Sequence, residues 1–321
     1  MLKHAAGVLG GHAWTILADA KHRVRPVIVP PSSPWSIDVD DGYGGHVRLT
    51  GKYATARDAD TAVLIVHGLG GSSESGYDRA LAHAAAERGW SSLRIDLRGA
   101  DGSGEDVYHA GLAEDLRAAL ESPALSRYRE VHVVGVSLGG HATLRLALDS
   151  VPRLGAVVAI SSPLDLAASC RAIDRRRAFA YRQHVLRSLK ASYRQVVTRH
   201  RHGPRVPTPL ATVESVRTIW DWDRTVVVPR HGFDDVPHYH RSMSVGPHLR
   251  TLTCPALYVG SPFDPMVPGT AVQPSLDAAG DALRVVMLDR GGHVGLPAPD
   301  LIRDAPPTLW GQLMGWLAAP A

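Results

Sequence analysis

The sequence has few cysteines and none of the spacings that metal-binding cysteines and histidines show. Only Cys170 and Cys254 occur among its 321 residues, with no Cys-x-x-Cys pattern. Such a pair supports neither a disulfide framework nor a zinc site, and it favours a reducing, cytoplasmic compartment. The chain holds 17 histidines but no His-Glu-x-x-His motif, so its histidine content does not by itself indicate a metal. We therefore expect neither a metal nor a cofactor.

Long apolar runs are also missing. No stretch approaches the roughly 20 apolar residues of a membrane-spanning helix. Only the N-terminus resembles a targeting signal: residues 1–4 are basic, residues 5–18 are mostly small or apolar, and Ala18-Asp19-Ala20 resembles a cleavage site. A histidine and several glycines interrupt this stretch, and four prolines follow it. We therefore expect residues 1–35 to form an ordinary N-terminal arm, with a cleaved signal and an arm at a membrane surface as alternatives.

A strong charge imbalance is absent as well. The formal net charge is +4 and the isoelectric point is about 9.2, with 45% hydrophobic and 21% charged residues. This is the composition of a globular protein, and a mildly basic balance does not by itself indicate nucleic acid. The length fits one large α/β domain with an insertion, or two ordinary domains.

Apolar strand-like runs alternate with helical patterns over the first half of the chain. This alternation predicts an α/β fold with a mostly parallel sheet and helices on both of its faces. The pattern stops after Ser162 and resumes at residue 255. The predicted strands are 36–39, 46–53, 61–66, 92–96, 131–134, 154–160, 255–260 and 283–288, and the predicted helices are 77–88, 112–120, 142–148, 272–279 and 307–317.

The interruption predicts a helical insertion of residues 163–249 between two core segments, 36–162 and 250–321. Within it, apolar positions at spacings of three and four, from Phe179 to Val196, predict one buried helix face. The opposite face is basic, and a solvated surface, an anionic lipid surface and an acidic substrate group all remain open for it. Nucleic acid is not expected, because no stacking aromatics accompany the charge. The basic residues are Arg171, Arg175, Arg176, Arg177, Arg182, Arg187, Lys190, Arg194, Arg199, Arg201 and Arg205.

One motif organises the chemistry. The apolar run at 131–134 ends in Gly135-Val136-Ser137-Leu138-Gly139, and a helical pattern follows. Gly-x-Ser-x-Gly between a strand and a helix is typical of a nucleophile elbow, which exposes the serine at the tip of a tight turn. Ser137 is therefore the candidate nucleophile, and the Leu138 amide can face an oxyanion.

A nucleophilic serine needs a base, and the base needs a carboxylate. Both should follow late strands, in the order Ser, Asp, His. Asp264 follows the predicted strand at 255–260, and His293 lies between glycines after the strand at 283–288. Leu69, in the loop after the strand at 61–66, is the candidate for a second oxyanion amide.

Two other histidines lie near these motifs, His67 before the Leu69 loop and His141 after the elbow. We expect structural roles for both, because neither holds the position that the base requires.

Several separate segments resemble one known family. The chain is similar to the α/β-hydrolase superfamily and, within it, to the YheT-like branch, which is related to the lipid-acting ABHD proteins. One position departs from the family pattern: the residue before the catalytic Asp is often Asp or Asn, and here it is Phe263. The similar segments are 67–75, 108–111 with Asp115, 231–236 with Tyr239 and Ser242, and 291–295.

The resemblance implies an α/β-hydrolase fold of about eight strands with a helical cap. It also implies hydrolysis of a small or lipid ester, with Ser137, Asp264 and His293 as the triad and Leu69 and Leu138 forming the oxyanion hole. Two other functions remain open: an acyltransferase that uses the same triad, and a catalytically silent binding protein on the same fold. Weak association of the basic cap with an anionic membrane is a further expectation.

Overall fold

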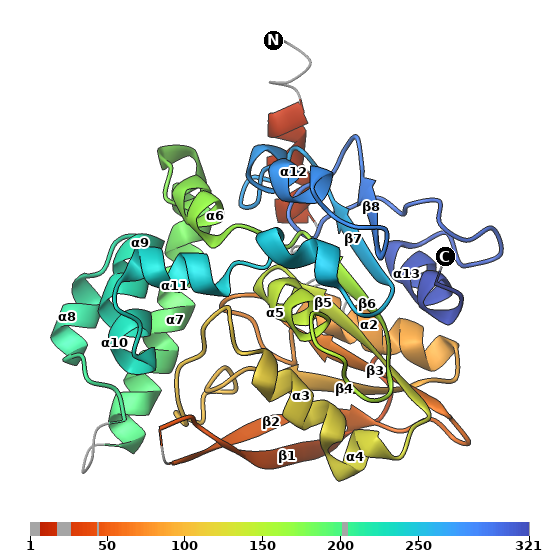
Figure 1. Cartoon of the computed structure of the whole chain (residues 1–321), viewed down its shortest axis with the longest axis horizontal. Helices are drawn as coiled ribbons and strands as arrows, with labels where there is room; N and C mark the ends of the chain where they lie inside the picture. Colours follow the sequence, from red (N-terminus) through yellow and green to blue (C-terminus); the bar gives the residue numbers. More distant parts are fainter. Residues whose placement is uncertain (1–6, 18–26, 44, 201–204, 321) are drawn as a thin grey trace.

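The computed structural model describes residues 7–17, 27–43, 45–200 and 205–320. Its centre is an eight-stranded sheet with the order β1-β2-β4-β3-β5-β6-β7-β8 (Figure 1). Strands β3 to β8 run parallel, whereas β2 is antiparallel to both β1 and β4. The strands are β1 (Ser33–Asp40), β2 (His46–Ala54), β3 (Thr61–Val66), β4 (Ser91–Asp96), β5 (Glu130–Val136), β6 (Leu154–Ile160), β7 (Ala256–Gly260) and β8 (Leu283–Met287).

Burial of the central strands explains why they are nearly continuous apolar runs. Every residue of β3 is buried, and so is every residue of β7. A parallel strand that is covered on both faces has no solvent side, so alternation of polar and apolar residues is lost. The sheet confirms the predicted α/β fold, and the strands predicted at 61–66 and 154–160 have the bounds that the sequence indicated.

Helices cover both faces of the sheet. Apolar side chains of α2 (Gly76–Glu87) and α13 (Leu309–Ala318) pack in one core cluster, and those of α3 (Ala113–Glu121), α5 (Leu138–Leu146) and α12 (Gly269–Asp277) pack in the other. The short helix α4 (Pro123–Ser126) follows α3 directly. Helix α5 begins at Leu138, four residues earlier than the sequence indicated, so Ser137 immediately precedes its first turn.

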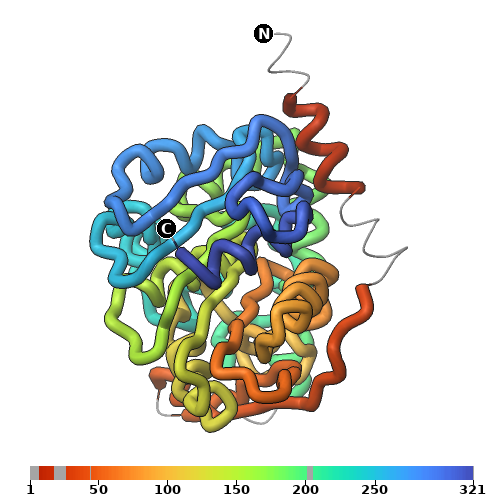
Figure 2. Tube along the Cα trace, turned by 90° about the vertical axis from the view of Figure 1, so that its right-hand side faces the viewer, coloured from red at the N-terminus to blue at the C-terminus, as the bar shows by residue number. Residues whose placement is uncertain are grey.

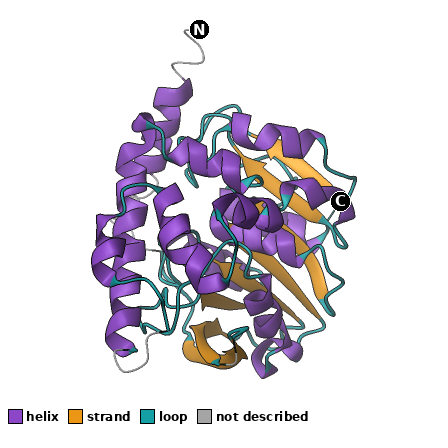
Figure 3. Ribbon diagram, turned by 60° about the vertical axis from the view of Figure 1, so that its left-hand side comes forward, coloured by secondary structure: helices purple, strands orange, loops and turns teal. Residues whose placement is uncertain are grey.

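The segment between β6 and β7 contains only helices and loops among its described residues, and these form the cap (Figure 3). Val185, Leu189 and Tyr193 lie on the buried face of its long helix, whereas Phe179, predicted on that face, is 55% exposed. The cap elements are α6 (Leu166–Ile173), η1 (Arg176–Ala178), α7 (Phe179–Arg199), α8 (Leu210–Ser215), α9 (Ile219–Trp222), the π-helix η2 (Asp223–Val227), α10 (Val228–His231), α11 (Val236–Met243) and η3 (Gly246–Thr251).

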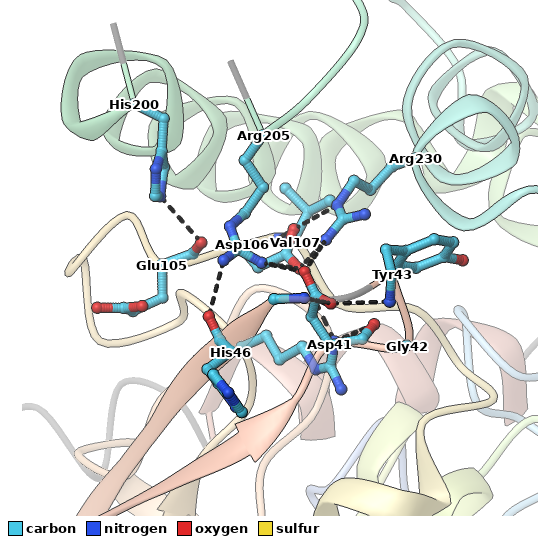
Figure 4. A network of polar contacts seen from close by, with 12 residues as sticks. Asp41, Gly42, Tyr43, His46, Glu105, Asp106, Val107, His200, Arg205 and Arg230 are labelled. Carbon is cyan, nitrogen blue, oxygen red and sulfur yellow. Dashed lines mark hydrogen bonds and ion pairs between the residues drawn. The ribbon is translucent and has the colours of Figure 1, made fainter. Parts of the chain in front are cut away.

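A buried network of charges links the cap to the turn between β1 and β2 and to Asp106, in the loop between β4 and α3 (Figure 4). Arg230 of α10 donates two hydrogen bonds to Asp106, with N–O distances of 2.8 and 2.7 Å. Arg205 lies 2.7 Å from Asp41 in the turn. Both carboxylates are buried, so their charges depend on these arginines for compensation.

In the described part of the N-terminal arm, residues 7–17 form a helix. This helix runs beside the C-terminal part of the chain (Figure 2), and its Gly11 packs against the backbone of Gly292. Residues 27–32 have no regular secondary structure, and the possible cleavage site at 18–20 lies outside the described residues. None of the helices described in the structure is both long and apolar enough to cross a membrane.

Candidate active site

The turn at Ser137 has the strained geometry of a nucleophile elbow. Ser137 adopts φ 54° and ψ −119°, which is rare for a residue with a side chain. Glycine is required on both sides, because a Cβ at Gly135 would lie 2.3 Å from the Gly139 oxygen, and a Cβ at Gly139 would lie 2.3 Å from the Val66 oxygen. The close approach of β5, α5 and β3 therefore holds the serine at the tip of the turn.

Asp264 and His293 form a hydrogen-bonded pair, although they come from different loops. The Nδ1 atom of His293 lies 2.8 Å from Oδ2 of Asp264. The other carboxylate oxygen, Oδ1, accepts hydrogen bonds from the Met266 and Val267 amides at 2.8 and 2.9 Å. Asp264 is 2% exposed, so these donors replace water around its charge. The pair can orient the imidazole with Nε2 free for proton transfer.

Ser137 and His293 line the same pocket. Among the residues that the structure describes, no hydrogen bond joins the Ser137 hydroxyl to the imidazole. Such bonds are often long in an unliganded enzyme and tighten when the substrate binds. The structure thus brings Asp264 and His293 into contact and places Ser137 on the wall that His293 also forms.

The loop after β3 contains both hydrogen-bonded and unpaired backbone amides. The Gly68 amide donates to the Tyr77 hydroxyl at 3.1 Å, and the Gly70 amide donates to the Tyr108 hydroxyl at 2.7 Å. Within the described part of the chain, the amides of Leu69 and Leu138 donate to no other group. Two unused N–H groups beside the serine are what an oxyanion hole requires.

Two pockets meet at the serine. The inner pocket lies between the core and the cap, and the outer pocket lies between the core, α7 and the helix at 7–17. Their cavity volumes are about 100 and 370 Å³. Ser137, Leu69 and Met266 line both pockets. An ester carbonyl at Ser137 could therefore direct its two substituents into different cavities.

Thr15 of the N-terminal helix is a site residue that the sequence did not reveal. The His293 amide donates to the Thr15 hydroxyl at 2.8 Å, and this hydroxyl donates to the Gly11 carbonyl, also at 2.8 Å. Thr15 and Ile16 also line the outer pocket. The helix is tied to the cap as well, because His12 Nδ1 lies 2.9 Å from the Tyr181 hydroxyl.

Phe263, the residue that departs from the family pattern, packs against this helix. A Cβ built on Gly7 would lie 2.3 Å from the Phe263 ring, and one built on Gly11 would lie 2.0 Å from the Phe263 oxygen. The helix therefore contacts the neighbours of both Asp264 and His293. No local pattern around residues 7–17 indicates these distant partners.

The two other histidines near the site are buried and have structural partners. His67 Nε2 accepts from the Leu97 amide at 3.0 Å, and burial lowers the pKa of this histidine. Nδ1 of His141 lies 2.8 Å from the carbonyl oxygen of Pro163, and Nε2 lies 2.8 Å from the carbonyl oxygen of Met243. Pro163 and Met243 lie near the two ends of the cap segment. Burial lowers the pKa of His141 to about 4.

Some basic residues of the face predicted for the cap form hydrogen bonds and salt bridges within the protein. Arg182 and Lys190 donate to backbone carbonyls, and Arg194 pairs with Glu214 at 2.6 Å. Arg201 lies outside the described residues. The arginines that remain exposed without a salt bridge to a described residue are Arg171, Arg175, Arg176, Arg177 and Arg187.

A group of side chains in the described structure could hold a metal ion, although no such site was expected. Cys170, Asp223 and His240 each place a ligand atom within 4.8 Å of the others. All three line the inner pocket on its cap side.

The sheet, the elbow and the paired His293 and Asp264 define an α/β hydrolase. Residues 61–297 match the family model of the alpha/beta hydrolase fold, and the chain belongs to that family.

Known relatives agree with the YheT-like branch. An Escherichia coli (strain K12) protein, YheT, which is provisionally named an esterase, is 28% identical over 266 residues, covering 79% of this chain and 76% of YheT. Human phospholipase ABHD3 is 23% identical over 296 residues, covering 88% of this chain and 72% of ABHD3. The solved structure of the Pyrococcus furiosus esterase Pf2001 has the same fold, with a TM-score of 0.53 and 17% identity over 84% of this chain and 90% of that one. The family and these names support a hydrolase.

Proposed function

We propose that the chain is a serine carboxylic-ester hydrolase that acts through Ser137, His293 and Asp264, on a small or lipid ester in a cytoplasmic compartment. The observation that carries the proposal is the position of Ser137 at the junction of two pockets. His293, which is hydrogen-bonded to Asp264, lines one of these pockets. A carbonyl held there meets a nucleophile, a base and unused amides together.

Each step follows from this arrangement. Ser137 attacks the ester carbonyl while His293 takes the hydroxyl proton, and Asp264 stabilises the imidazolium. The Leu69 and Leu138 amides stabilise the oxyanion. The alcohol leaves with the proton from His293, and water activated by His293 then releases the acid from the acyl-enzyme.

The two pockets divide the ester between them. His293 gives its proton to the leaving alcohol, so the alcohol part must lie on the side that His293 lines, which is the outer pocket. Leu69 and Leu138 line the inner pocket, whereas His293 does not. We therefore assign the acyl group to the inner pocket.

The test is hydrolysis of p-nitrophenyl esters of increasing acyl length, with fluorophosphonate labelling, for wild type and Ser137→Ala. The proposal requires turnover and labelling of wild type and the loss of both in the variant, by roughly 10³-fold or more in kcat. The exposed Ser126→Ala provides the matched control and should behave as wild type. Equal behaviour of wild type and Ser137→Ala would overturn the role of Ser137.

The exposed arginines of the cap support a second proposal, weak association with anionic membranes. Sedimentation with vesicles of anionic and of neutral lipid tests it. Binding should be confined to the anionic vesicles and should fall at high salt. Equal binding to neutral vesicles would contradict it.

A further inference from the structure

The inner pocket carries a polar cluster on its cap side that the proposed mechanism does not use. Asp223 of η2, His240 of α11 and Ser169 of α6 all line it. Much of the remaining wall is apolar, with side chains such as Leu166 and Trp222. Polar groups in such a wall fix the orientation of a ligand when they lack partners within the protein.

Asp223 and His240 form a buried pair. His240 Nε2 lies 2.8 Å from Asp223 Oδ2, and the two residues are 2% and 7% exposed respectively. The carboxylate contact therefore uses Nε2 of the His240 ring.

The contact with Asp223 leaves the other ring nitrogen, Nδ1 of His240, for a ligand. It donates or accepts a hydrogen bond according to the tautomer of the ring.

Two polar atoms of the cluster lack partners in the described part of the chain. Among the residues described, neither Nδ1 of His240 nor the hydroxyl of Ser169 has a hydrogen-bond partner, and both atoms are shielded from solvent. Leaving such groups unpaired costs free energy. Asp223 also begins the π-helix η2, and π turns are frequent at functional sites. These separate observations favour a ligand-binding role over a purely structural one.

The chemistry of the cluster limits the ligand. A charged group would be buried in a pocket whose wall is mostly apolar, which is costly. An uncharged oxygen avoids that cost. A hydroxyl can donate to Nδ1 or accept from it, a carbonyl oxygen can accept from it, and either can bond the Ser169 hydroxyl. A hydroxyl or a carbonyl oxygen meets both requirements.

We propose that Asp223, His240 and Ser169 form a subsite for an uncharged oxygen group carried by the acyl chain of the substrate. This inference rests on the proposed esterase function and on the assignment of the acyl group to the inner pocket. It narrows the substrate class to esters of short hydroxy or oxo acids.

The test compares p-nitrophenyl esters that differ only in this oxygen. Butyrate is paired with 3-hydroxybutyrate, and hexanoate is paired with 6-hydroxyhexanoate and 5-oxohexanoate, in wild type, His240→Phe and Ser169→Ala. We expect kcat/KM of wild type for at least one oxygenated ester to exceed that for its alkyl match by about 10-fold or more. Both variants should reduce this ratio, which compares each oxygenated ester with its alkyl match in the same variant.

Ser169→Ala removes a hydroxyl that has no partner among the described residues, so it carries the test if His240→Phe does not fold. The exposed His248→Phe is the matched control and should keep the wild-type ratio. A wild-type ratio near one for every pair overturns the inference but leaves the esterase function standing. No hydrolysis of any ester overturns both.

Metal analysis of the purified protein separates the remaining alternative, because Cys170, Asp223 and His240 could also hold a cation. One equivalent of zinc that is lost in His240→Phe would overturn the oxygen subsite.

Discussion

The backbone amide of His293 donates a hydrogen bond to the hydroxyl of Thr15, 278 positions earlier in the chain, at an N–O distance of 2.8 Å. The Thr15 hydroxyl directs its own proton to the Gly11 carbonyl, which leaves a lone pair for the amide. The N-terminal helix thus fixes the backbone of the proposed base, just as Asp264 fixes its ring. Both constraints favour one position of the imidazole.

Thr15→Val should lower kcat for p-nitrophenyl butyrate by roughly 10-fold, with a smaller change in KM. Valine keeps the shape of threonine but cannot accept the His293 amide, so the loop loses its anchor while the helix keeps its packing. Steady-state kinetics measures the effect. Thr15→Ser keeps the hydroxyl and should restore most of the activity. A loss in Thr15→Ser as large as in Thr15→Val would refute a positioning role.

Adjacent glycines of the N-terminal helix provide a matched pair for a second prediction. A Cβ on Gly11 would lie 2.0 Å from the Phe263 oxygen, whereas a Cβ on Gly10 would have no neighbour within 4 Å. Gly11→Ala should displace the helix from the loops of Asp264 and His293, and kcat should fall at least as far as in Thr15→Val. Gly10→Ala should keep wild-type activity and gain about 0.5–1 kcal/mol of helix stability. Equal kinetics for the two variants would contradict this packing.

How far the sequence could predict this molecule depends on the range of each interaction. The strands at 61–66 and 154–160 were predictable, because burial on both faces produces a continuous apolar run. The loops of Asp264 and His293 were predictable from their place after strands, since parallel strands bring their carboxyl ends to one edge. The start of α5 was not, because Gly139 and Gly140 are weak helix formers and tertiary packing overrides their propensity.

The role of Thr15 illustrates what local pattern cannot supply. Its partner is a backbone amide, which has no residue type to recognise in a sequence. Phe263 is similar, because it is a departure from a polar family position and its contacts with Gly7 and Gly11 exist only after folding. Such contacts depend on which distant segments the fold brings together.

Substitution of Arg230 tests how much the charge network between the cap and the core contributes to the free energy of unfolding. Arg230→Met should lower the free energy of unfolding by about 3–5 kcal/mol, because it leaves Asp106 buried with less compensation. Arg194→Met is the control: Arg194 pairs with Glu214 but its side chain is 50% exposed, so its loss should cost less than about 1 kcal/mol. Guanidinium unfolding measures both. Similar costs for the two variants would show that the buried network does not hold the cap.

Asp78 of α2 should make stability depend on pH. It is 0% exposed, and neither carboxyl oxygen has a hydrogen-bond partner among the described residues. Burial raises the pKa of Asp78 well above its ordinary value. Between the unfolded and folded pKa values, the unfolded chain releases a proton that the folded chain keeps, so this residue makes stability fall as pH rises.

Asp78→Asn should remove that dependence, because asparagine resembles the protonated acid and does not titrate. Its gain over wild type in the free energy of unfolding should widen by more than about 1 kcal/mol between pH 4.5 and 8. Urea unfolding across this range measures the difference. Asp58→Asn, at a side chain that is 94% exposed, should show no such widening. If the two variants follow the same pH trend, Asp78 is ionised in the folded protein, and a cation such as the nearby Arg94 must compensate it.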